Sequence, residues 1–369
     1  MLDGIIERRR RAVSAAILAH YGEQYLPHAV LLPNARFGLY AAAREMLLPG
    51  DQVLISPVTC RTVIDALRAA EARPVFLDIE LATGNIDVAR IPDTLLRNAR
   101  AIVTTNLYGN PDGALELSRV AKAHGLLLIE DCAHVLDTSI EGRQIGGIGD
   151  VSVFSFKKYF DETGGVATVR NEDAARRVRA RVAAETSAPP APYDRARYLQ
   201  FVLAQTAGSS VAGAVSSLVR HSGNGNPRGH RESQRAFGTD PKLMPTTAAL
   251  LRVAGLLSRR RELISKRMEA ARQLRAHCPL EPKTTRYQAH VCPMVVPFAS
   301  CRRDQIIAAL RKRGIGTYFL YTPPMNQIFE DLAPAHEIDA DLIEHWCRTI
   351  LPIDLRYSRE ALDAIHSVF

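Results

Sequence analysis

Two adjacent lysines, Lys157 and Lys158, follow a strand-like apolar run that ends at Phe156, and a Gly-Gly pair comes shortly after them. A lysine amine is a nucleophile that can condense with an aldehyde when its surroundings favour the uncharged form. The same pair could equally be two solvated charges on a loop, because lysines mostly lie at protein surfaces. The neighbouring segments of the sequence must distinguish these interpretations.

Polar residues also follow two other apolar runs. Asp131 and His134 come directly after the run Leu126–Ile129, and Asn106 and Tyr108 follow an upstream run. A carboxylate at the end of a buried strand costs several kcal/mol unless a partner compensates it. Asp131 is therefore either the cap of the next helix or a carboxylate held ionised against a buried cation.

A fourth candidate feature is the start of a helix near Ala35 and Arg36. The first N–H groups of a helix have no partner within it and carry a partial positive charge, so they can hold an anion such as phosphate. Every helix has such an end, so this feature needs partners from elsewhere in the fold.

The elements that would position these residues alternate along the first half of the chain. The expected strands are Gln52–Ser56, Pro74–Leu77, Ala101–Thr105, Leu126–Ile129, Val151–Phe156 and Val166–Val169. The expected helices are Arg36–Leu47, Thr62–Ala72, Ile91–Asn98 and Leu115–His124. This alternation predicts an α/β fold with a mainly parallel sheet covered on both faces. Ligands of such sheets bind beyond the carboxyl ends of the strands, where the polar loops lie.

The second half of the chain has a different pattern. Residues 185–240 are rich in Ala, Ser, Pro, Gly and Arg around one apolar helical piece, Tyr198–Val219. We then expect a long helix over Thr246–His277, a strand over His290–Val296, a helix over Arg303–Arg313 and a strand over Gly316–Tyr321. A last helix–strand–helix follows them. We expect a large domain over residues 1–245 and a small α+β domain over 246–369.

Composition narrows the class of protein further. The chain has 369 residues, 47% of them hydrophobic, which is enough for a full core and two domains. No apolar run reaches the roughly 18 residues of a membrane span, and the N-terminal segment lacks a secretory cleavage site. The net charge of +8 is scattered without a nucleic-acid-binding motif. The six cysteines form no C-x-x-C pair, so we expect reduced thiols, no metal site and a cytoplasmic location.

The polar loops together match the needs of pyridoxal 5′-phosphate (PLP). Its aldehyde requires a lysine amine for a Schiff base, and its protonated ring nitrogen requires a carboxylate such as Asp131. Its phosphate requires N–H and hydroxyl donors, which the helix at Ala35 and the hydroxyl of Ser155 could supply.

The chain resembles the DegT/DnrJ/EryC1/StrS aminotransferases, which are fold-type I PLP enzymes related to aspartate aminotransferase. The segments that carry the resemblance are ARPVFLDIELATGNIDVARI, the stretch from ARAIVTTNLYG to DVSVFSF, the TGGVATV that follows, RKRGIGTYFLYTPP and ILPIDL. It covers most of residues 30–170 and, more loosely, 245–369. The segment 180–245 departs from the common pattern of the family.

The resemblance implies roles for individual residues. Asp131 would be the partner of the pyridine nitrogen, His134 would lie by the ring hydroxyl, and Ser155 would bind the phosphate. The backbone of Ala35 and Arg36 would replace the family's Gly-Thr-like phosphate contact. Cys60, or its neighbour Arg61, occupies the loop where many relatives place an aromatic residue over the ring, so the stacking residue stays open.

The spacing around the lysines leaves three alternatives. The interval from Phe156 to Gly164 is about three residues shorter than the usual family pattern, in which the lysine follows Ser-Phe after three residues. Counting back from the Gly-Gly pair selects Lys157, whereas the compact loop of divergent members selects Lys158, which we favour. The third alternative is that the family lysine has been lost.

The implied activity is a PLP-dependent transfer of an amino group from an amino acid, in this family usually glutamate, to a keto-sugar, expected to be nucleotide-linked, or a related cyclic ketone. The candidate substrate neighbours are Asn106, Tyr108, His290 and Tyr321, and Arg228 and His230 could meet a substrate phosphate. A PLP-dependent dehydration and a non-catalytic family relative are the alternatives. The family also implies a homodimer, and we expect no membrane or nucleic-acid partner.

Overall fold

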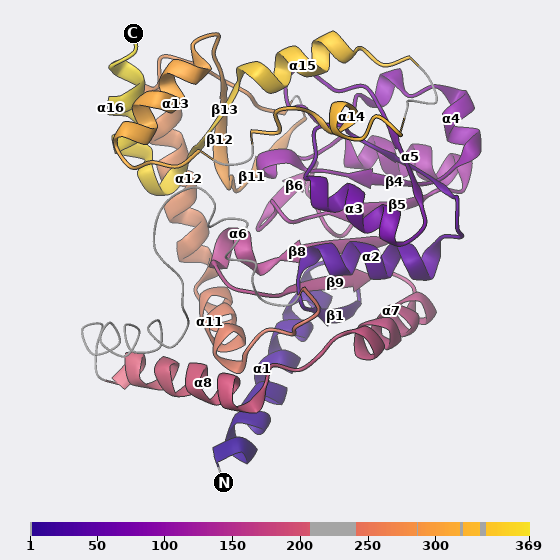
Figure 1. Cartoon of the computed structure of the whole chain (residues 1–369), viewed down its shortest axis with the longest axis vertical. Helices are drawn as coiled ribbons and strands as arrows, with labels where there is room; N and C mark the ends of the chain where they lie inside the picture. Colours follow the sequence, from indigo (N-terminus) through magenta and orange to yellow (C-terminus); the bar gives the residue numbers. More distant parts are fainter. Residues whose placement is uncertain (1, 207–240, 286, 318–319, 333–336) are drawn as a thin grey trace.

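The computed structural model describes residues 2–206, 241–285, 287–317, 320–332 and 337–369 (Figure 1). Its centre is a seven-stranded sheet in the order β1-β9-β8-β5-β4-β2-β3. The strands are β1 (His28–Leu32), β2 (Gln52–Ile55), β3 (Arg73–Phe76), β4 (Ala99–Thr104), β5 (Leu127–Asp131), β8 (Val151–Ser155) and β9 (Gly165–Val169). Strands β3, β2, β4, β5 and β8 are parallel, and β9 pairs antiparallel with both β8 and β1. This is the mainly parallel sheet that the sequence predicts.

Helices cover both faces of this sheet because each contributes an apolar stripe. On one face, α2 (Ala35–Met46), α3 (Arg61–Ala69) and α7 (Glu172–Glu185) bury Phe37, Val63 and Val178 in a common core. The opposite core receives buried side chains from other helices, including α1 (Leu2–Gln24), α4 (Asp93–Asn98), α5 (Ala114–His124) and α11 (Thr247–Ser258). Burial on both faces explains why the strands are almost continuously apolar.

A second, smaller core lies toward the C-terminus. The helices α12 (Arg260–His277), α13 (Arg303–Lys312) and α16 (Ser358–His366) pack around the antiparallel sheet β10-β12-β13. Its strands are β10 (Glu281–Pro282), β12 (Val295–Ala299) and β13 (Ile350–Asp354). The buried residues of α11 belong to the core of the large sheet, whereas Ala271 and Leu274 of α12 belong to this small core.

The remaining elements connect these layers. A small antiparallel sheet, β11-β6-β7, pairs β11 (Ala289–Val291) with β6 (Thr138–Ile140) and β7 (Arg143–Gln144). The other helices are α6 (Phe156–Phe160), α8 (Ala191–Thr206), α14 (Met325–Ile328) and α15 (Ala340–Thr349), with 3₁₀ turns at Val88–Arg90, Leu107–Gly109 and Leu355–Tyr357. No described helix combines the length and apolar character needed to cross a bilayer.

The structure differs in four places from what the sequence led us to expect. Strand β1 was not predicted. The long helix expected over Thr246–His277 is broken at Arg259, whose φ of −106° and ψ of 19° are not helical. The strand expected over His290–Val296 is two strands of different sheets, β11 and β12. No strand forms in the described part of Gly316–Tyr321, where Tyr321 has a left-handed φ of 50° that is outside the strand region.

Candidate active site

The two neighbouring lysines point to different environments. They lie on the short helix α6, which Ser155 at the end of β8 caps by accepting the N–H of Lys157. Lys157 is exposed, and its Nζ is 2.6 Å from Oδ1 of the exposed Asp161. Burial lowers the pKa of Lys158 to about 8, while Cys60 and Asp131 raise it and Lys157 lowers it. Lys158 is less exposed than Lys157, and it lies within electrostatic range of Asp131.

Asp131 ends strand β5 and is 7% exposed. Burial raises its pKa to about 6, although a hydrogen bond from Ala133 N at 2.9 Å and the charge of Lys158 lower it. The carboxylate thus does more than cap the following turn, because a nearby cation also stabilises its charged form.

The preceding carboxylate has a different role. Glu130 points to the opposite face of the sheet and accepts N–H groups from Gly146, Ile148 and Gly149 at 2.7–3.0 Å. It also accepts the hydroxyl of Ser152 at 3.2 Å. With these donors Glu130 fixes the loop between β7 and β8, so the side-chain alternation of one strand separates a structural carboxylate from a site carboxylate.

His134 lies beside the same site in a defined tautomer. Its Nδ1 accepts the N–H of Tyr108 at 3.1 Å, and burial lowers its pKa well below the usual range, with a further contribution from Lys158. A neutral imidazole whose Nδ1 accepts a hydrogen bond carries its proton on Nε2. The rings of His134 and Tyr108 are stacked with centroids 6.3 Å apart.

Ser155 and the start of α2 lie at the end of neighbouring strands. Ser155 pairs with Gly165 across β8 and β9, and Gly165 pairs with Leu32 of β1, which leads into α2. A Cβ added at Gly165 would lie 2.3 Å from the carbonyl oxygen of Phe154 and 3.4 Å from Ala35 N. The glycine therefore allows the backbone at Ser155 and the N-terminus of α2, where Ala35 and Arg36 lie, to approach closely.

Cys60 and Tyr321 come from distant parts of the chain to the same cluster. Cys60 is the exposed residue that precedes α3, and its thiol influences the pKa of both Lys158 and Tyr321. Burial raises the pKa of Tyr321 well above its usual range, and Tyr108, Cys60 and Asp131 raise it further. The rings of Tyr321 and Tyr108 have centroids 6.1 Å apart.

Asn106 is buried behind Asp131. Its Nδ2 donates to the main-chain oxygen of Asp131 at 3.2 Å and to Thr104 Oγ1 at 2.9 Å, while its Oδ1 accepts Asp112 N at 3.2 Å. This side chain is 0% exposed, so the geometry favours support of Asp131 over contact with a substrate.

His290 lies apart from the cluster around Lys158. It pairs with Ser139 in the small sheet, is exposed, and places its Nε2 3.7 Å from Asp137 Oδ2. A surface groove lined by Ser139, Glu141, Gly142, Gln288, Ala289 and His290 runs beside it. Arg228 and His230 lie outside the described residues.

Sequence reasoning missed two supporting residues. Asp112 is buried and accepts the N–H groups of Thr105, Asn106 and Ile86. Tyr159 donates toward two main-chain oxygens beside the site. The PDG turn that holds Asp112 was a detectable signal, because an Asp in such a turn commonly accepts backbone N–H groups.

Comparison with known proteins identifies the family. The model of the DegT/DnrJ/EryC1/StrS aminotransferase family matches residues 15–368. The chain belongs to this family. The fold-type I architecture and the family expected from the sequence are thereby confirmed. Its structural neighbour DesI, solved in the presence of its TDP-sugar product, has a TM-score of 0.70 and 22% identity over 99% of this chain and 84% of that chain.

Two curated relatives align over a shorter region. The spore coat polysaccharide biosynthesis protein SpsC of Bacillus subtilis is 33% identical over 156 residues, which are 41% of this chain and 40% of that protein. A GDP-perosamine synthase of Escherichia coli O157:H7 is 28% identical over 135 residues, 36% of this chain and 37% of that protein. These alignments therefore span about two fifths of each relative's length.

Aminotransferases of the DegT/DnrJ/EryC1/StrS family depend on PLP, and the residues of this chain fit that group. Lys158 offers an amine of lowered pKa, and the buried Asp131 offers a carboxylate that needs a cationic partner. Ser155 and the first N–H groups of α2 offer phosphate donors at a place where Gly165 leaves room for the backbone. The PLP expectation holds at the level of the family and of the donor set.

Proposed function

We propose that this protein is a PLP-dependent sugar aminotransferase. It would transfer an amino group from an amino-acid donor, expected to be glutamate, to a keto-sugar carried on a nucleotide. The observation that carries the proposal is the position of Lys158, which lies within electrostatic range of the buried Asp131 while Lys157 pairs with Asp161 at the surface. Relatives named GDP-perosamine synthase and a DesI structure with a TDP-sugar product support this substrate class.

Each residue of the cluster has a distinct task in this proposal. PLP, when bound, supplies an electrophilic ring system that can hold the electrons of a broken Cα–H bond. Lys158 would be the residue that holds the aldehyde of the cofactor, and its free amine would be the group that carries a proton during the transfer. Its lowered pKa favours this role, because a base works best when its pKa lies near the operating pH.

The remaining groups orient the ring. Asp131 would hold the protonated ring nitrogen, and a cation there would favour the charged form of a carboxylate that burial otherwise disfavours. His134 Nε2–H donates toward the ring hydroxyl. Ser155 and the N-terminus of α2, at Ala35 and Arg36, bind the phosphate. Cys60, or its neighbour Arg61, would take the place over the ring that an aromatic residue has in many relatives.

We propose Tyr321, whose ring adjoins that of Tyr108, as a substrate neighbour. Tyr108 is only 1% exposed, so a supporting role is favoured for it, as for Asn106. The homodimer is part of the same proposal and follows from the family, as does the division into a large domain, 1–245, and a small domain, 246–369. A reducing, cytoplasmic location is supported by the cysteines, all six of which are free.

Borohydride trapping with peptide mapping tests the proposal. Reduction of the coloured holoenzyme should leave the cofactor attached to Lys158, and a label on Lys157 or a colourless protein that gains no colour with added PLP would contradict it. Product analysis with glutamate and a nucleotide-linked keto-sugar then tests the reaction. Stoichiometric 2-oxoglutarate supports transamination, whereas dehydration of the sugar without it would show a different PLP reaction.

A further inference from the structure

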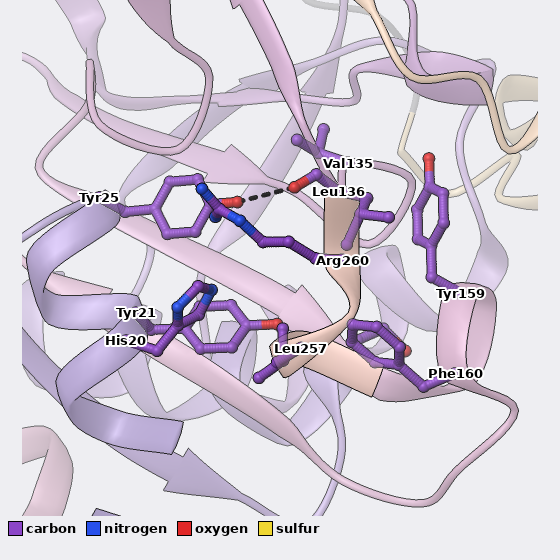
Figure 2. A pocket seen from close by; sticks show the side chains of 10 residues that line it. His20, Tyr21, Tyr25, Val135, Leu136, Tyr159, Phe160, Leu257 and Arg260 are labelled. Atoms are coloured by element: carbon purple, nitrogen blue, oxygen red, sulfur yellow. Dashed lines mark hydrogen bonds between the residues drawn. The ribbon is translucent and has the colours of Figure 1, made fainter. Parts of the chain in front are cut away.

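The hydroxyl of Tyr159 connects three segments of the chain. It lies 2.8 Å from the main-chain oxygen of His134 and 3.0 Å from that of Cys292. The side chain is buried, and Tyr159 directly follows Lys158 on α6. Figure 2 shows Tyr159 and Phe160 of α6 beside Val135 and Leu136, which belong to the loop that carries His134.

The ring of Tyr159 is also fixed from a fourth segment. The guanidinium carbon of Arg267, on α12, lies 4.9 Å from the ring centroid. The same side chain donates through Nη1 to the main-chain oxygen of Met294 at 3.3 Å. A Cβ added at Gly109 would lie 3.0 Å from the oxygen of His134 and 3.3 Å from that of Cys292, so these segments pack tightly.

The short helix α6 needs such contacts to hold its place. Helix nucleation is unfavourable, and five residues are too few to be stable in isolation. Consecutive residues of a helix differ by about 100° in direction, so a fixed Tyr159 also fixes the direction of Lys158. The loop after α6 is fixed separately, by the ion pair between Arg252 of α11 and Glu162.

We propose that Tyr159 is a positioning residue that holds Lys158 and His134 in register with each other and with the segment Cys292–Met294. The lysine amine and the imidazole then keep fixed positions relative to each other. The inference takes its catalytic meaning from the proposed function, in which both groups contact PLP. Its test can be made on the cofactor-free protein, so the two can fail independently.

The test compares Tyr159→Phe with Tyr287→Phe. Tyr287 also donates its hydroxyl from a partly buried position, to Glu116 Oε2 at 2.9 Å, and Glu116 lies on α5 and not on α6 or the His134 loop. The reactivity of each lysine in the apo-protein is measured against pH by competitive acetylation and peptide mass spectrometry. In Tyr159→Phe the titration midpoint of Lys158 should rise by about one pH unit, because a less constrained amine is better hydrated. In Tyr287→Phe it should stay unchanged.

The holoenzyme gives a second measurement. Tyr159→Phe should raise the rate of PLP dissociation roughly tenfold and lower kcat more than it raises KM for the sugar. A wild-type titration of Lys158 in a folded Tyr159→Phe variant would overturn the proposal. If that variant does not fold, Arg267→Gln, which keeps the hydroxyl but frees the ring, decides. A rise in its Lys158 midpoint supports the proposal and a wild-type midpoint overturns it. If the wild-type protein binds no PLP while the variants show these shifts of the Lys158 midpoint, the proposed function alone is contradicted.

Discussion

Lys158 and Asp131 stabilise each other's charge at a place where burial disfavours both charges. Burial lowers the pKa of the lysine to about 8 and raises that of the aspartate to about 6, and each partner opposes the shift of the other. The charges of this cluster are therefore unfavourable in the free protein. A ligand that binds the amine and places a cation beside the carboxylate would lower the electrostatic free energy of the cluster. Active sites often carry such a stability cost.

The two lysines should differ sharply when each is removed. Lys158→Ala should lower kcat by at least about 10³-fold, because the variant loses both the covalent link to PLP and the proton carrier. Lys157→Ala, which removes only an exposed ion pair with Asp161, should keep activity within about twofold and stability within about 0.5 kcal/mol. Steady-state rates and urea unfolding of both variants measure this difference. Equal losses would contradict the assignment of Lys158.

Asp131→Asn should stabilise the apo-protein at neutral pH while weakening PLP binding. The folded-state pKa of about 6 lies above the ordinary value of 3.8, so the folded protein binds this proton more tightly than the unfolded chain. That contribution to stability is complete below about pH 4 and is lost as pH rises through 6. The asparagine variant avoids the loss and should be more stable by about 1–3 kcal/mol at pH 7. Unfolding curves of the two apo-proteins should converge near pH 4, and a constant difference would refute the linkage.

The pH dependence of PLP binding follows from the same carboxylate. Asp131 must be ionised to hold a protonated ring nitrogen, so PLP affinity should fall as pH drops below about 6, by up to tenfold per unit. Equilibrium dialysis of PLP between pH 5 and 8 measures this fall. Asp131→Asn should show a weaker affinity that changes little over the range, whereas an unchanged slope in the variant would assign the titration to another group.

The sequence indicated where the candidate site residues lie along the chain more clearly than it indicated how their side chains are oriented. Asp131, His134 and Ser155 lie on apolar strands or directly after them, so strand alternation and the family pattern locate them. Spacing favoured Lys158 over Lys157 without deciding between them, because adjacent helical positions are equally allowed by the chain. The choice depends on how α6 is held by the local cap Ser155 and by the bonds of Tyr159 to His134 and Cys292, which are distant in sequence.

For the fold too, some elements could be predicted from the sequence and others could not. Its parallel strands are mostly buried and show as apolar runs, whereas β1 is a short run between Pro27 and Pro33 and was missed. The break at Arg259 has no proline or glycine to signal it, because it arises where α11 packs on the large core and α12 on the small one. Local sequence cannot predict a helix break that depends on tertiary packing.

Ser155→Ala should weaken PLP binding roughly tenfold through loss of a phosphate donor. The substitution also removes the cap of α6, in which Ser155 Oγ accepts Lys157 N at 3.3 Å. Asn171→Ala is the matched control, since Asn171 caps α7 through Ala174 N at 3.0 Å and lies away from the site. Inorganic phosphate should protect the wild-type apo-protein against PLP binding more strongly than it protects Ser155→Ala. Equal effects of both cap variants on affinity would indicate a purely structural role for Ser155.

Glu130→Gln should destabilise the protein without changing which lysine binds PLP. Glu130 accepts N–H groups from Gly146, Ile148 and Gly149 and the hydroxyl of Ser152, and an amide would place its own hydrogen atoms against these donors. Such a mismatch in a buried network costs about 2–4 kcal/mol. Urea unfolding should show this loss, while borohydride trapping of the folded fraction should still label Lys158. A variant with normal stability but reduced trapping would reverse the roles assigned here to Glu130 and Asp131.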